Sequence, residues 1–169
     1  FIAKDKVVAK KDTAEIHADR LIARYTGDEG IDVTDLTAEG SVVIISPPYT
    51  AYGDRAVYDV KSGNAILTGT DLRITTETER LTAKDRIEYN ATEDRLVAVG
   101  DAVAVKEDKT LTAKTLTAFF TKGADGKKTT QKITAEGPVV IKTAKETVTG
   151  DSGVYDVAGQ SAVLTGHVV

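Results

Sequence analysis

The chain has 169 residues, a length typical of one domain with a sizeable core, and 41% of them are hydrophobic and 28% charged. This balance excludes a disordered chain, and no run approaches the roughly 20 apolar residues of a transmembrane helix. The net charge of −4 argues against nucleic-acid binding, and the absence of cysteine excludes disulfides and cysteine-ligated metals.

Stiff β-branched side chains dominate the composition. The chain contains 19 Val, 11 Ile and 24 Thr, against 9 Leu and no Met. Such residues favour the pleated surface of a sheet, and no segment repeats apolar residues at helical spacing for three turns. We therefore predict an all-β, antiparallel protein that forms a single domain over residues 1–169. Because the chain starts at Phe1, we also expect it to be processed or cut at its ends.

The predicted strands are clearest in residues 40–69. A strand over 41–46 should end at Pro47, because proline cannot donate to a strand ladder. Further strands are expected over 52–60 and 65–68, with turn residues between them. Later turns are predicted at 91–94 and 158–160, and longer hairpin loops at 26–32 and 123–130. Turns at this spacing are typical of a sandwich or barrel-like protein.

Two landmarks recur and divide the chain into about five copies of a unit of roughly 30 residues. The first is a glycine that follows an apolar strand, at Gly40, Gly69, Gly100, Gly137 and Gly166. The second is a small residue followed by Asp or Lys and then by an aromatic residue, at Tyr25, Tyr58, Tyr89, Phe120 and Tyr155. The aromatic series fits either a buried seam or a stripe that lines a ligand groove.

The apolar positions around the glycines indicate which residues face inward. They lie two and four residues before each glycine, and mostly three and five residues after it. A change from even to odd offsets predicts a bulge or bend at the glycine, because a straight strand alternates strictly. On this basis the predicted inward-facing residues are Val43, Ile45, Leu67, Leu72, Ile74, Leu96, Val103, Val105 and Val140.

No pattern in the chain predicts catalysis. His17 and His167 lie near opposite ends, and we expect both to be structural or solvent-facing. The repeated acids Asp19, Asp54, Asp85 and Asp151 could form a calcium site, but their basic neighbours favour cross-strand charge pairing. Phosphate-binding glycine motifs are absent. We therefore predict no catalytic residue, no metal site and no cofactor.

Two segments resemble the repeat of the OstA/LptA-like family of periplasmic lipopolysaccharide transport proteins. They are residues 83–89 with 96–105, and residues 149–156 with 162–168. The resemblance implies an open, twisted, V-shaped β-jellyroll of two sheets that enclose a groove for the acyl chains of lipid A. The nine predicted inward-facing residues would then line this groove.

The resemblance also implies a non-enzymatic periplasmic protein that bridges the inner and outer membranes. Its partners would be lipopolysaccharide and LptC-like and LptD-like proteins of the same fold. The absence of a transmembrane segment favours the LptA type over LptC, while the N-terminal domain of LptD stays an alternative.

Two other hypotheses stay open. One is a structural β-solenoid or adhesin-like repeat with a dry, filled core, and the other is an envelope enzyme, which would need two carboxylates facing one cleft. The chain ends also lack the polar cap of repeat proteins. We expect Val168 and Val169 to form an apolar edge that supports end-to-end self-association.

Overall fold

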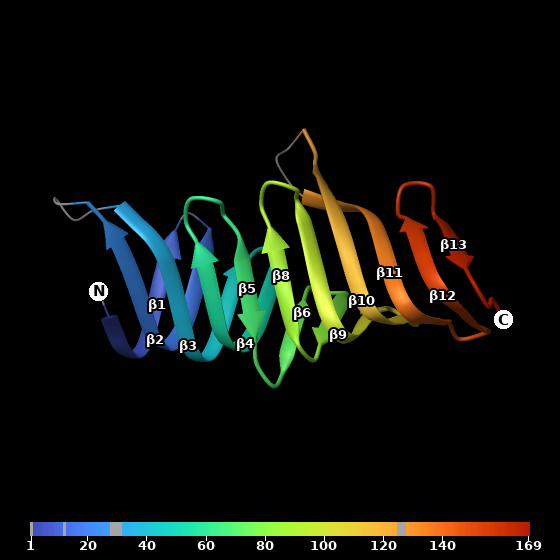
Figure 1. The fold of residues 1–169 in the computed structure, drawn as a ribbon, viewed down its shortest axis with the longest axis horizontal. Coiled ribbons are helices and arrows are strands. Elements are labelled where there is room, and N and C mark those ends of the chain that lie inside the picture. Colours follow the sequence, from blue (N-terminus) through green and yellow to red (C-terminus); the bar gives the residue numbers. More distant parts are fainter. Residues whose placement is uncertain (1, 12, 28–31, 125–127) are drawn as a thin grey trace.

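The computed structural model describes residues 2–11, 13–27, 32–124 and 128–169 (Figure 1). These residues form strands, turns and bends, and none of them belongs to a helix able to cross a membrane. The all-β prediction is confirmed. The thirteen strands are β1 (Ile2–Lys11), β2 (Ala14–Thr26), β3 (Asp32–Ser46), β4 (Tyr49–Asp59), β5 (Ala65–Thr68), β6 (Leu72–Thr75), β7 (Glu79–Ala83), β8 (Arg86–Asn90), β9 (Arg95–Lys106), β10 (Lys109–Lys122), β11 (Lys128–Lys142), β12 (Thr147–Asp156) and β13 (Ser161–Thr165).

All strands belong to one antiparallel sheet that folds over itself into two layers, as in a jellyroll. The order is β1-β2-β3-β4-β5-β8-β9-β10-β11-β12-β13, with β6 and β7 side by side between β4 and β9. Strands follow one another along the long axis, and the two chain ends lie at opposite ends of it (Figure 1). The sheet is therefore open, with β1 and β13 as its edges.

Most strands bend halfway, so their two halves lie in different layers. Layer A consists of residues 2–4, 20–26, 32–39, 55–59, 65–68, 86–90, 95–99, 115–122, 128–136, 152–156 and 161–165. Layer B consists of residues 7–11, 14–18, 42–46, 49–53, 72–75, 79–83, 102–106, 109–113, 139–142 and 147–150. The layers meet along the row of bends, at the lower edge of Figure 1.

The bend in β9 shows why glycine recurs. Gly100 has a φ of +91° and Asp101 a φ of +41°, and the ladder to β10 shifts register between Ala113 and Thr115. An L side chain at the first position would be strained, whereas glycine adopts this conformation freely. The predicted bulge is confirmed, and the glycine lies within the strand. The expected three short strands per unit are therefore mostly two long, bent ones.

The two landmarks of the repeat meet at each bend. The carboxyl group of Asp85, between β7 and β8, lies against Gly100, where a Cβ atom would come within 2.5 Å of its Cγ atom. Asp54 of β4 lies in the same way against Gly69 and accepts hydrogen bonds from Thr70, from the backbone N–H at 2.8 Å and the hydroxyl at 3.0 Å. The repeated acids thus pack over the glycine of the next strand.

The expected cross-strand charge pairing uses a different acid. Arg20 and Arg55 both lie beside Glu39 of β3, at 3.2 and 3.7 Å, rather than pairing with the adjacent Asp19 and Asp54. Glu39 lies opposite both arginines in the ladders of layer A. For Asp19 and Asp54 the predicted charge pairing is therefore wrong, whereas Asp151 lies 2.8 Å from His167.

The loops fall where the sequence places them. β3 ends before Pro47 and β4 begins at Tyr49, and turns occupy 91–94 and 157–160. The predicted loop over 123–130 is shorter, because β11 already begins at Lys128. Parts of the two longer loops, 28–31 and 125–127, lie outside the described residues.

The core is a continuous strip of small and aliphatic side chains along the bends. Its buried members are Ala18, Leu21, Ala38, Val42, Ala56, Leu67, Leu72, Ala83, Ile87, Ala98, Ala102, Ala113, Leu116, Ala135 and Val139. Alanine at so many of these positions lets the layers approach closely at the bend. The molecule is therefore closed along the bends, and the turns of layer A between β4 and β5, β8 and β9, and β12 and β13 lie at the upper edge of Figure 1.

Candidate functional site

The strand register aligns the inner side chains of layer A into two rows along the axis. The row next to the bends consists of Leu21, Ala38, Ala56, Leu67, Ile87, Ala98, Leu116, Ala135, Gly153 and Leu164. The second row, nearer the turns, consists of Ala23, Leu36, Tyr58, Ala65, Tyr89, Leu96, Ala118, Ile133, Tyr155 and Ala162. Neither row contains a charged residue.

Layer B presents two matching rows from the other side. The row next to the bends consists of Val7, Ala18, Val42, Gly53, Leu72, Ala83, Ala102, Ala113, Val139 and Gly150. The second row consists of Ala9, Ile16, Ile44, Ala51, Ile74, Leu81, Ala104, Leu111, Ile141 and Val148. The space between the layers is thus lined by hydrocarbon on both sides.

The second rows face inward, yet they are not sealed from solvent. Ala98 and Ala102, beside the bend of β9, are fully buried, whereas Leu96 and Ala104 on the same strand are only partly buried. A filled interior would bury all four. The layers therefore diverge from the bends and leave an apolar groove that opens toward the turns. At the C-terminal end a small apolar hollow lies among Leu111, Ile133, Val139, Ile141 and Leu164, with other residues of β11 to β13 around it.

The structure divides the predicted groove residues into two groups. Leu67, Leu72, Ile74 and Leu96 lie in the inner rows. The inward orientation is wrong for the other five, which alternate with inner residues and lie on the outer face of layer B: Val43, Ile45, Val103, Val105 and Val140.

The physical reason is the number of residues that each bend uses. In β3, β9 and β11 the inner face resumes two residues after the glycine, at Val42, Ala102 and Val139. Residues 69–71 separate β5 from β6, so there the inner face resumes one position later, at Leu72. An odd offset from the glycine to the next inward-facing residue, as predicted, therefore occurs in one copy of these four, at Gly69 and Leu72. The large apolar side chains of Val42 and Val139 could have indicated that the second residue after the glycine faces inward. The small side chain of Ala102 gives no such indication.

The repeated aromatic residues lie toward the open edge of the groove. Tyr58, Tyr89 and Tyr155 belong to the second inner row of layer A and are partly buried. Tyr25 is exposed, and Phe120 is partly buried near the end of β10. Since none of the five is fully buried, they do not form a buried seam.

One group of residues, which we call the rim cluster, joins the two layers across the open edge: Tyr49, Tyr89, Asp94, Phe120 and Lys128. The rings of Tyr49, in layer B, and Phe120, in layer A, meet edge to face with centroids 6.3 Å apart. The Lys128 ammonium lies 4.9 Å from the centre of the Tyr89 ring and donates hydrogen bonds to the Tyr89 hydroxyl and the Asp94 carboxylate. Sequence analysis missed Tyr49, because the contact joins residues from different copies of the repeat.

The electrostatics of the rim cluster follow from its position. Burial raises the pKa of the Tyr49 hydroxyl above its usual value, with the negative charge of Glu79 adding to the effect. The hydrogen bond from Lys128 lowers the pKa of the Asp94 carboxyl. The cluster therefore holds one cation and one carboxylate beside three aromatic rings at the mouth of the groove.

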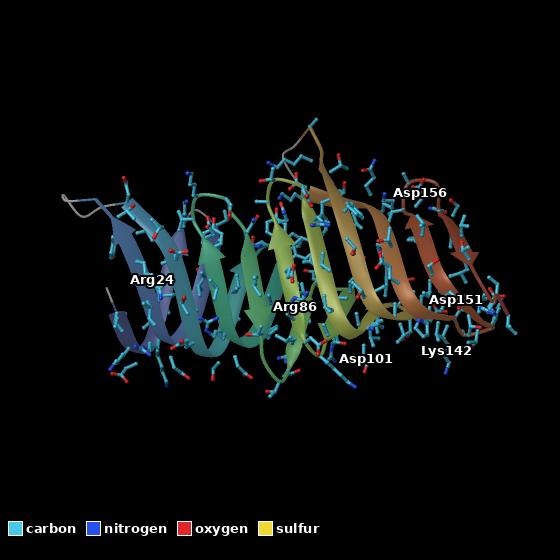
Figure 2. All side chains as sticks on the ribbon, in the orientation of Figure 1. Arg24, Arg86, Asp101, Lys142, Asp151 and Asp156 are labelled. Carbon is cyan, nitrogen blue, oxygen red and sulfur yellow. The ribbon has the colours of Figure 1, made fainter. Side chains whose placement is uncertain are left out.

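Further charged groups lie at the turn ends of the strands, such as Glu79 with Lys106 2.6 Å away, or on the outer faces. Arg24, Arg86 and Asp156 project from the outer surface of layer A (Figure 2). His17 lies 3.1 Å from Glu15 and His167 lies 2.8 Å from Asp151, at opposite ends of the molecule. The described residues contain no group of three or more His, Asp or Glu side chains able to hold a metal. What the groove offers is a surface for apolar chains.

The C-terminal residues extend the edge of layer B. The Thr149 N–H donates to the carbonyl of Val169 at 2.9 Å, and the Val169 N–H donates back at 3.3 Å. Val168 and Val169 are 52% and 88% exposed, and Val163 of β13 is 63% exposed. These exposed valines lie at the end of the axis opposite β1 (Figure 1).

Comparison with known proteins agrees with this architecture. The family model described as "LptA/(LptD N-terminal domain) LPS transport protein" matches twice, over residues 1–95 and 82–169. The chain also resembles the crystal structure of LptH from Pseudomonas aeruginosa, described as the LptA homologous periplasmic component of a conserved lipopolysaccharide transport device. The TM-score is 0.57 at 18% identity, over 69% of this chain and 81% of that one. No curated protein matches the chain. Because the family model covers both halves of the sequence, the chain belongs to the LptA/(LptD N-terminal domain) family of lipopolysaccharide transport proteins.

Proposed function

We propose that this protein is a non-enzymatic, periplasmic carrier that holds the acyl chains of lipid A in the groove between layers A and B. The observation that carries the proposal is the pair of second inner rows, which are apolar along the whole axis and, apart from the buried Ala23, at least partly exposed. Burial of each CH₂ group is worth about 0.8 kcal/mol, so several chains supply ample affinity. The net charge of −4 gives no general attraction for a phosphorylated head group.

A bridging role between membranes is supported by the two open edges. β1 and β13 each have a free side, and exposed edge strands accept a further strand from another chain. A partner of the same fold, whether a second copy or an LptC-like or LptD-like protein, would extend both layers and align its groove with this one. Head-to-tail contacts of this kind do not close on themselves and can therefore span a distance.

Lipid binding is tested with neighbouring residues that face opposite ways. Leu96 lies in the second inner row, and Val97 of the same strand lies on the outer face. We expect Leu96→Asp to weaken capture of lipopolysaccharide by the purified protein at least tenfold, because a carboxylate at this position would contact only hydrocarbon. A tenfold loss of affinity corresponds to about 1.4 kcal/mol of binding free energy. Val97→Asp is the matched control. Equal losses in the two variants, or a wild-type protein that captures no lipopolysaccharide, would support the solenoid with a filled core instead.

The edge contact is tested in a second experiment. Val168→Asp adds charge to the exposed edge, and Ile66→Asp adds the same charge to an outer-face residue of similar exposure in the middle of the sheet. Light scattering at increasing concentration should show end-to-end association that Val168→Asp weakens and Ile66→Asp does not. A wild type that stays monomeric at millimolar concentration contradicts self-association.

A further inference from the structure

The rim cluster closes the open edge of the groove at one point along its length. Tyr49 is the first residue of β4 and Phe120 lies near the end of β10, so both occupy the parts of their strands farthest from the bends. Their rings meet although one comes from layer B and the other from layer A. Lys128 and Asp94 lie beside them on the layer A side. The second inner rows of both layers continue beneath this contact, for example with Tyr58 and Ala65 in layer A and Ala51 and Ile74 in layer B.

The repeat shows that this cover is a local feature. Residues 37–44 recur almost unchanged as residues 134–141, and in this alignment Glu146 takes the place of Tyr49. Tyr25 takes the place of Phe120 in the aromatic series and is 43% exposed. In the described part of the chain, Tyr49 and Phe120 form the one contact between aromatic rings. The repeat alone therefore does not produce the cluster.

A covered mouth matters for a ligand with apolar chains and a polar head. The chains lie between the layers, whereas the head group stays in water, because burying unpaired polar and charged groups is costly. The link between head and chains must therefore pass through the mouth of the groove at every position along the axis. At the rim cluster, the contact between Tyr49 and Phe120 occupies that path.

We propose that the rim cluster is a checkpoint for ligand movement, at which a lipid passing along the groove must part Tyr49 from Phe120. This inference rests on the proposed function. The lipid class that meets the barrier has a head group too large and polar to follow its chains under the two rings, as a phosphorylated saccharide lipid does. A free fatty acid could pass beneath the rings in its protonated form and would meet a much smaller barrier.

The test uses the absence of cysteine from the natural chain. Cysteines replace Tyr49 and Phe120, and a bis-maleimide with a reducible disulfide in its spacer links them, which holds the mouth shut until reductant is added. A photo-reactive benzophenone residue replaces either Tyr58 or Tyr155, which occupy equivalent positions in the second inner row on β4 and β12. An N-terminal histidine tag holds the β1 end at nickel-chelating liposomes that contain lipopolysaccharide.

With the mouth linked, we expect cross-links to lipopolysaccharide at position 58 and at least tenfold slower cross-linking at position 155. Reduction of the spacer should restore cross-linking at position 155 in the same sample. Tyr49→Ala should speed arrival at position 155 by roughly two- to tenfold, the range expected for loss of one aromatic pair. Tyr25→Ala, which changes an exposed aromatic residue of the same series, should leave the rate unchanged, and circular dichroism confirms that each variant is folded.

Two results would overturn the inference, and they are distinguishable. Equal rates at position 155 before and after reduction, with normal cross-linking at position 58, reject the checkpoint and leave the proposed function intact. No cross-linking at either position in the reduced protein rejects lipid binding in the groove, and the checkpoint with it.

Discussion

Substitution of Gly100 by alanine tests the account of the bend. Gly100 has a φ of +91°, and a Cβ atom there would lie 2.5 Å from Cγ, 2.6 Å from Oδ2 and 2.8 Å from the backbone nitrogen of Asp85. That backbone cannot move away freely, because the Lys84 N–H donates to the Gly100 carbonyl at 2.7 Å and the Asp85 N–H donates to Val99 at 3.0 Å. The new methyl group therefore meets both a strained conformation and a fixed neighbour.

The expected loss of stability follows from these two effects. A left-handed conformation costs an L residue about 1–2 kcal/mol, and overpacking adds about 1–3 kcal/mol. We expect Gly100→Ala to lower the free energy of unfolding by about 2–5 kcal/mol and the Tm by roughly 5–15 °C. Gly27→Ala is the matched control, because Gly27 has a φ of +116° with open space around it. It should show the strain alone, about 1–2 kcal/mol.

Urea unfolding followed by circular dichroism measures both variants. The double variant Asp85→Ala/Gly100→Ala removes the carboxyl group but keeps the backbone nitrogen, so it should recover part of the loss. Equal destabilisation by Gly100→Ala and Gly27→Ala would refute the claim that the Asp85–Gly100 contact, rather than φ alone, requires glycine at the bend.

Two further predictions concern the core and the turns. Leu72→Ala should lower the free energy of unfolding by about 2–5 kcal/mol, because Leu72 is 2% exposed in the row beside the bends. Urea unfolding measures this loss, with the outer-face variant Val103→Ala as the control. A loss no larger than that of Val103→Ala would contradict the place of Leu72 in the core. The Asp59 carboxylate accepts a hydrogen bond from the Ser62 backbone N–H at 2.7 Å, which lowers its pKa. A lowered pKa in the folded state means that the stabilisation is complete above the unfolded pKa of about 3.9 and is lost as the pH falls through the folded value. Thermal unfolding from pH 6 to pH 2 should therefore show a flatter decline for Asp59→Asn than for the wild type, and parallel curves would contradict this role.

The sequence was sufficient for the fold and for the position of the bends. β-Branched composition and the recurring glycines depend on local backbone preference, and both the all-β class and the bulges at Gly40, Gly100 and Gly137 are confirmed. The likeness to the transport family also held. These features are repeated several times, so each copy supports the others.

Whether an individual side chain points inward or outward was harder to predict. Val42 and Val43 are both apolar, and only the number of residues that the bend uses decides that Val42 points inward. The rim cluster was out of reach, because Tyr49 and Phe120 meet through the crossing of two layers. Such a contact depends on the twist of the whole sheet, which no local pattern encodes.

The ladder architecture makes the reach of this protein a matter of copy number. Apart from the rim cluster, the main contacts of each strand in the described chain are with its neighbours in the ladder. Gain or loss of one hairpin would change the length of the axis by two strand spacings, roughly 10 Å, and would leave distant hairpins undisturbed. A protein built in this way can be lengthened by duplication, in steps of about 30 residues, without redesign of its interior. The near-identity of residues 37–44 and 134–141 is the sequence similarity that such a duplication leaves.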